Sequence, residues 1–269
     1  MNLDELKEKL SDIKADNYLP GNADIGELIT EMMRNIGSAD YVLRDELIYS
    51  TLNKWTVIGV ISAAQMREML SVCLDDEHLF YKIGEYGTDA VFTRTFSVLI
   101  VPLAFYIDSK ERFLSEPEVN DIKERVIRYL ELEKDVRGYV EGKGWAHSIA
   151  HAADALDDIA KSEYIGRSAL LEILAAMKDK VCVDYYTYIH KEDERMAAAA
   201  LSVFEREVLR REEIVRWINS FGDAYSIDTF TAGTHHENIR KFLRSLYLAA
   251  GDRGMKDIAD AALNVLGNI

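Results

Sequence analysis

Proline is scarce in this chain, with three prolines among 269 residues. Because an interior proline removes a backbone donor and breaks a helix, long stretches of the chain are free to be helical. Apolar residues recur at spacings of three and four, which is typical of amphipathic helices, and strict alternation is nearly absent. The sequence therefore predicts an all-α protein. The most strand-like stretch, VCVDYYTYI at 181–189, lacks a partner strand, so we expect a loop or a distorted helix there.

Several helix starts are marked by capping residues. Asp24, Ser62 and Ser115 each precede an amphipathic run. Ser115 is followed three residues later by Glu118, which together form a capping-box pattern, and Pro117 falls in the first turn, where its missing N–H costs nothing. We therefore expect a helix to begin after each of these three residues.

The helix starts also indicate a repeat. Ser62, Ser115 and Ser168 occupy similar points of three helices and are 53 residues apart each time. The second helices of these pairs are expected from Thr88, Trp145 and Glu192, a fourth pair from Arg211 and His236, and a degenerate leading pair at 24–36 and 39–53.

Helix pairs that repeat every 40 to 55 residues or so are typical of α-α superhelices of the HEAT or armadillo kind. We therefore expect one helical-repeat domain over 1–269, with 1–60 as an N-terminal helical extension or degenerate leading repeat. The second helices would line the concave side of a right-handed superhelix. Two connections, 135–144 and 222–235, are long for links between helices, which favours a functional role for them.

The charge balance excludes some partners. The chain has 47 acidic residues against 32 Lys and Arg, a net charge of −15, and no Lys/Arg-rich run. Nucleic acid and anionic membranes are therefore not expected as partners.

The sequence also favours a cytoplasmic protein. The N-terminus lacks the basic and apolar regions of a signal peptide, and the longest apolar stretch, Phe96–Ile107, is interrupted by Ser97 and Pro102 and is too short to span a bilayer. Cys73 and Cys182 are isolated, which fits two buried thiols in a reducing compartment.

The segment GKGWAHSIAHAADALDD at 142–158 is the sharpest local feature. On a helical wheel, His147, His151 and Asp154 fall on the side opposite an apolar stripe that contains Trp145. Two histidines at i and i+4 with a nearby carboxylate can offer ligands to a zinc-like divalent metal. A solvated polar face, with His–Asp pairs worth about 0.2–0.5 kcal/mol each, explains the same pattern, and both interpretations stay open.

Further candidates come from neighbouring repeats and from the glycine-containing loop before Trp145. Glu192 to Arg195 open a helix, where acids also favour the helix dipole, and in a stacked repeat Glu194 would approach the histidines. The candidate ligand-binding residues are Arg94, Arg137, Trp145, Asp193, Glu194 and Arg195, the candidate catalytic residues are His147, His151 and Asp154, and the candidate metal ligands are His147, His151, Asp154 and Glu194.

Four segments carry a resemblance to a known family. DAVFTRTFSVLI at 89–100, RGYVEGKGWAHSIAHAADAL at 137–156, EDERMA at 192–197 and NIRKFLRSLYLA at 238–249 resemble successive motifs of a bacterial family known by the domain-of-unknown-function number 2785. GWAHxxAH is the most specific of these motifs. The resemblance implies a helical-repeat fold and no established activity, and the helices of the first 60 residues rest on periodicity alone.

Two function classes remain. The motifs of dinucleotide, P-loop, α/β-hydrolase and zincin sites are absent from the sequence. We therefore favour a cytoplasmic protein- or peptide-binding module that uses the concave groove, with a basic partner segment. The alternative is a small-molecule enzyme or ligand-binding protein with a His147/His151 site, in which a divalent metal would assist hydrolysis or one histidine would act as general base.

Overall fold

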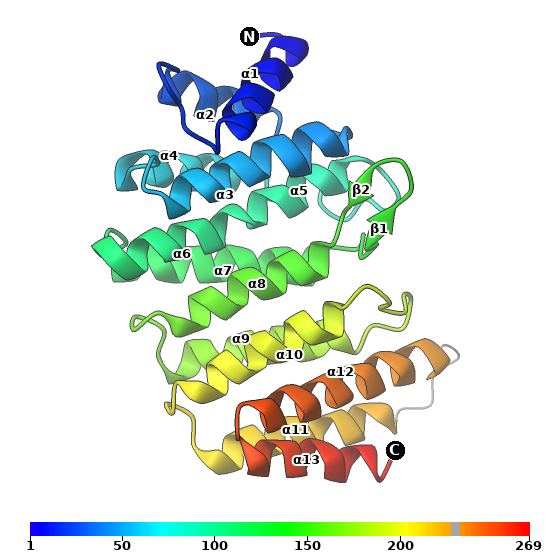
Figure 1. Cartoon of the computed structure of the whole chain (residues 1–269). Helices are drawn as coiled ribbons and strands as arrows, with labels where there is room; N and C mark the ends of the chain where they lie inside the picture. Colours follow the sequence, from blue (N-terminus) through cyan, green and yellow to red (C-terminus); the bar gives the residue numbers. More distant parts are fainter. Residues whose placement is uncertain (227–231) are drawn as a thin grey trace. The chain divides into compact units, whose positions relative to one another are not determined.

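The computed structural model describes residues 1–226 and 232–269, which are predominantly helical (Figure 1). This confirms the all-α prediction. The chain divides into two compact units, one formed by Met1–Glu118 with Leu132–His151 and the other by Val119–Glu131 with Ala152–Ile269. A single HEAT-like superhelix stays a prediction. Part of the connection expected at 222–235 lies outside the described residues.

The first unit is built from helices and one small hairpin. Its helices are α1 (Leu3–Ala15), α2 (Ile25–Arg34), the π-helix η1 (Val42–Tyr49), α3 (Ser50–Val57), α4 (Ala63–Cys73), α5 (Ala90–Val98) and α6 (Ile100–Glu111). Trp55 and Phe92 are fully buried in its core. The indole Nε1 of Trp55 donates to the carbonyl of Tyr18 at 2.9 Å, so even the polar atom of this large core side chain is satisfied.

The second unit contains the remaining helices. They are α9 (Arg167–Val181), α10 (Glu192–Glu205), α11 (Arg211–Tyr225), α12 (Ala232–Asp252) and α13 (Lys256–Leu266), and α7 (Glu116–Leu132) and α8 (Ser148–Lys161) contribute residues to both units. α12 packs against α10 and α13 (Figure 1). Trp217 makes edge contacts with Phe221 and Phe242, at ring distances of 5.0 and 5.9 Å, in the core of this unit.

The predicted helix starts are largely confirmed. The Asp24 carboxylate accepts from the N–H of Glu27 at 3.0 Å, and Ser62 forms a capping box at the start of α4. Ser115 precedes α7, and its N–H donates to Glu118 at 2.8 Å. Ser168 differs, because α9 begins after Gly166 and Ser168 lies inside its first turn. The third member of the predicted register is therefore shifted relative to the other two.

The helix expected from Trp145 begins later than predicted. Residues Tyr139–Val140 (β1) and Gly144–Trp145 (β2) instead form an antiparallel hairpin in which Tyr139 faces Trp145. His147 has a positive φ of 54°, and its carbonyl accepts from the N–H of His151 at 3.0 Å. His147 therefore lies at the turn from the hairpin into α8, and the predicted helical wheel is wrong for Trp145 and His147.

Two expectations need correction, one about the longest apolar stretch and one about the burial of Cys182. The run Ala90–Glu111, formed by α5 and α6, has 22 residues and contains an 18-residue window with a mean hydropathy of 1.8, so it is long and apolar enough to cross a membrane by length and composition alone. In the structure 83% of that window is buried inside the protein. Cys73 is buried as expected, but Cys182 is only half-buried, and burial still raises the pKa of its thiol to about 12. Val181 is the last residue of α9, and the rest of the stretch at 181–189 is a loop, as expected.

We predict that Glu213 stabilises the fold in a pH-dependent way. Hydrogen bonds from the Arg167 side chain and the Arg210 N–H lower the pKa of Glu213 from 4.5 to about 2. A carboxyl whose pKa is lowered by folding stabilises the protein above its ordinary pKa, and this stabilisation is lost as pH falls towards the folded value. Glu213→Gln should lower the thermal midpoint at neutral pH, and the deficit should shrink as pH falls from 4.5 to about 2.

Thermal unfolding followed by circular dichroism over that pH range measures the effect. Glu212→Gln is the matched control, because the neighbouring Glu212 is exposed. An equal deficit for Glu213→Gln at all pH values would contradict the prediction.

Candidate functional site

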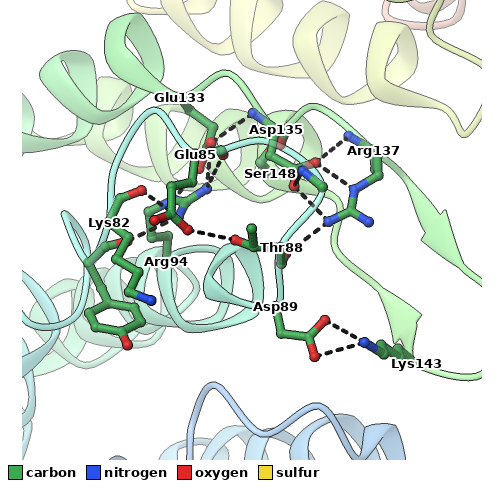
Figure 2. Close-up of polar contacts among 12 residues, drawn as sticks. Lys82, Glu85, Thr88, Asp89, Arg94, Glu133, Asp135, Arg137, Lys143 and Ser148 are labelled. Atoms are coloured by element: carbon green, nitrogen blue, oxygen red, sulfur yellow. Dashed lines mark hydrogen bonds and ion pairs between the residues drawn. The ribbon is translucent and has the colours of Figure 1, made fainter.

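A buried ion pair holds the segment that follows α7. Arg94 on α5 and Glu133 just after α7 are both fully buried. The Arg94 Nε and Nη2 donate to the two carboxylate oxygens of Glu133 at 2.6 and 2.8 Å, and its Nη1 donates to the carbonyl of Tyr81 at 3.0 Å (Figure 2). This two-pronged geometry is the one that makes a buried Arg–carboxylate pair stable. Arg94, expected to contact ligand, therefore holds the chain in place from inside.

The network continues into the hairpin through Asp135. The buried Asp135 carboxylate accepts from the Gly87 N–H at 2.9 Å and from the Arg137 Nη2 at 2.6 Å. Its carbonyl accepts from the Ser148 hydroxyl at 2.7 Å, at the first residue of α8. Asp135 also raises the pKa of Arg137, mainly through the hydrogen bond between the two side chains. Figure 2 shows these residues joining the loop before α5, the hairpin and the start of α8.

Arg44, which is distant from the hairpin in sequence, also contacts it. This fully buried residue of η1 donates to the carbonyl of Lys143 at 2.7 Å, and its guanidinium lies 4.1 Å from the centre of the Phe92 ring. A Cβ added at Gly144, where φ is +78°, would meet the Cβ of Tyr41 at 2.8 Å. Only glycine fits here, because the strand lies directly on η1 and takes a left-handed backbone conformation.

Aromatic rings and imidazoles form a continuous row from the hairpin to the core. Trp145 contacts Tyr139 edge-on at 5.1 Å and stacks on His147 at 4.3 Å. His147 lies 5.7 Å from His151, whose ring in turn contacts Phe96 at 5.4 Å. The row places both histidines beside indole and phenyl rings. We call the outer end of this row the hairpin face, and it consists of Tyr139, Trp145 and His147.

The hairpin face is accessible. Tyr139 is 52% exposed and Trp145 is 40% exposed, whereas His147 is half-buried. The exposed salt bridge between Lys143 and Asp89, at 2.7 Å, lies in the same unit and ties the turn of the hairpin to the start of α5 (Figure 2). Two large rings are thus presented to solvent on a backbone that is anchored by buried charged residues.

His151 is oriented by the backbone. Its Nδ1 lies 3.2 Å from the carbonyl oxygen of Thr95, which can only accept a hydrogen bond. The Nδ1 must therefore carry a proton and donate it to this carbonyl. The carbonyl of Thr95 thus orients the His151 ring.

The carboxylates expected near the histidines have other partners. In the second unit Asp154 accepts from the Arg195 Nη1 at 2.6 and 2.8 Å, and burial raises the pKa of Asp154 although Arg195 opposes this. Asp193 accepts from the Ser245 hydroxyl at 2.6 Å. Glu194 is exposed and lies 3.6 Å from the Lys191 ammonium. These contacts link α8, α10 and α12 and have ordinary structural roles.

The predicted metal set can be compared with the geometry of the described residues. Among them, no group of three or more His, Cys, Asp and Glu side chains is arranged to hold a metal ion. His147 and His151 do lie side by side, but no third ligand of these types joins them within the described part of the chain. Of the predicted metal site, the structure therefore brings together only the pair His147 and His151.

Sequence reasoning missed the residues that position the hairpin. These are Arg44 and Glu133, and the exposed Tyr139 of the hairpin itself was missed as well, although the unusual length of the connection at 135–144 pointed to this region. Buried charges that pair across long sequence separations leave no local pattern, and Arg44 bonds a residue 99 positions away.

A comparison of the sequence with known protein families identifies the family of this chain. The family described as "Protein of unknown function (DUF2785)" matches residues 79–248, which is more than half of the chain. The chain belongs to this DUF2785 family. The match includes the hairpin, Arg94, Glu133 and both histidines, while Arg44 lies before it. No curated protein and no solved structure matches the chain.

We predict that the Arg94–Glu133 pair is essential for stability. Glu133→Gln would leave the Arg94 charge buried without its counter-charge, which costs about 3–5 kcal/mol. Urea unfolding should show this loss. Asp121→Asn removes the exposed partner of Arg125 and serves as the control, with an expected cost of about 1 kcal/mol or less. A Glu133→Gln protein as stable as the control would contradict the prediction.

Proposed function

We propose that this protein is a peptide-binding module whose hairpin face receives a basic segment of a partner protein. The observation that carries the proposal is the exposure of Tyr139 and Trp145 on a hairpin that buried ion pairs hold from within. The helical repeat expected from the sequence would serve as its scaffold, and the cytoplasm as its compartment.

The chemistry of the two rings supports binding. Tyr and Trp bury a large area at little conformational cost, and they are enriched among the residues that dominate binding energy. A rigid support favours affinity further, because less freedom is lost when the partner binds. Exposure of two such rings beside each other is thus better explained by a partner than by the stability of the hairpin.

The charge of the protein supports a basic partner. The net charge is −15, and Lys143, next to Gly144 of the hairpin, is neutralised by Asp89. Indole and phenol rings attract Lys and Arg side chains through cation–π contacts, worth about 0.5–2 kcal/mol each. Long-range attraction would speed the encounter, and its contribution would fall as salt screens the charges.

We predict that Trp145→Ala weakens binding of basic peptides. An array of Lys- and Arg-rich peptides, with Glu-rich peptides of the same lengths as comparison, provides the probes. The wild-type protein should bind basic members, more weakly at high salt, and Trp145→Ala should lose about tenfold in affinity, or 1.4 kcal/mol. Binding is measured by fluorescence anisotropy of labelled peptides.

Leu248→Ala is the matched control, because Leu248 is 63% exposed on α12 in the second unit. Its affinity should equal that of the wild type. Equal binding of acidic peptides, or equal losses in Trp145→Ala and Leu248→Ala, would overturn the proposed function.

A second candidate function is histidine-dependent binding or turnover of a small molecule. The observation that favours it is the closeness of the two imidazole rings, whose centres lie 5.7 Å apart, with the Nδ1 of His151 held by the carbonyl of Thr95. Elemental analysis and zinc titration should then show metal in the wild type and none in the His147→Ala/His151→Ala variant. Zinc bound equally by both proteins, or by neither, would remove the metal-dependent form of this alternative.

A further inference from the structure

A small pocket lies between α2 and α4 in the first unit. Its volume is about 260 Å³. Ile29 and Met33 of α2 and Met69 of α4 line it, and all three are buried residues of the core. Methionine side chains adapt readily to the shape of an apolar ligand. The volume is slightly below the range of about 300–1,000 Å³ typical of drug-sized ligands, so a short alkyl chain or a single ring is the apolar group that fits.

One polar wall of the pocket is His78, which follows α4. Its Nδ1 lies 2.9 Å from an oxygen of the Asp75 carboxylate, and its side chain is 19% exposed. Because an ionised carboxylate can only accept, Nδ1 carries a proton, and in the neutral form of the ring Nε2 is then the hydrogen-bond acceptor. Asp75 thus fixes which nitrogen of His78 remains available to a ligand.

The charges around the pocket favour a cation. Arg34 lines it too, but its guanidinium is engaged by Glu31 at 2.6 Å. Glu68 lines it from α4, is exposed, and forms no ion pair with any residue that the structure describes. The carboxylate of Glu68 is therefore the uncompensated charge at this site, in a protein that is already strongly acidic.

From this arrangement we propose that the α2–α4 pocket binds a small primary amine with a short apolar chain or ring. The apolar part packs against Met33 and Met69. The ammonium has three donors, and it gives one to the Glu68 carboxylate and one to the His78 Nε2. The site is independent of the hairpin face, and all of its lining residues precede the family match at 79–248.

Three probes with one hexyl chain test the proposal: hexylamine, hexanol and hexanoate, measured by calorimetry or by NMR titration at neutral pH. Hexylamine should bind most tightly and hexanoate most weakly. Glu68→Gln should weaken hexylamine binding about tenfold, because a charge-assisted hydrogen bond becomes a neutral one, while hexanol binding changes little. His78→Phe should weaken hexylamine several-fold by removing the acceptor and keeping a ring in its place.

Glu27→Gln is the matched control, because it removes an exposed carboxylate from α2 that does not line the pocket. It should leave hexylamine affinity unchanged, and all variants should keep the wild-type circular dichroism spectrum. The proposal is overturned if no probe binds, if hexanoate binds as tightly as hexylamine, or if Glu27→Gln and Glu68→Gln weaken hexylamine equally.

Discussion

The buried pair of Arg94 and Glu133 is the interaction on which the rest of the first unit depends. Both charges are removed from water, so they are tolerated only because each meets the other in a two-pronged geometry and the remaining atoms find backbone partners. Glu133 also accepts from the N–H of Asp135, and Asp135 in turn binds Arg137 and the loop before α5. The direction in which the chain leaves α7 is thereby set, and with it the position of the hairpin and the start of α8.

The hairpin shows how tertiary contacts override a local pattern. The spacing of Trp145 and His147 suits a helix, yet this segment is extended up to His147. Arg44 and Tyr41 supply the reason, since Arg44 bonds the carbonyl of Lys143 and Tyr41 leaves no room for a side chain at Gly144. An extended strand can satisfy Arg44 through its backbone carbonyls, whereas the carbonyls of a helix interior are already bonded within the helix. The change from helix to hairpin moves Trp145 onto an exposed surface.

The two proposed sites of the first unit use the same acidic charge in different ways. On the hairpin face, rings provide the contact area and the net charge attracts a basic segment from a distance. In the α2–α4 pocket, one local carboxylate, Glu68, and one imidazole, His78, select a small cation by direct hydrogen bonds. The family match covers the first site and not the second, so the pocket is a property of the N-terminal helices.

The sequence by itself determined the helical class and the helix starts at Asp24, Ser62 and Ser115. These features depend on local rules, since a capping side chain reaches only three residues along the chain and amphipathic spacing repeats within one helix. The tertiary structure alone decided the hairpin, the orientation of His151 by Thr95, and the partner of Asp154. Each of these depends on a hydrogen bond to a group that is distant in sequence. The spacing of residues along the chain does not show which distant group will form that bond.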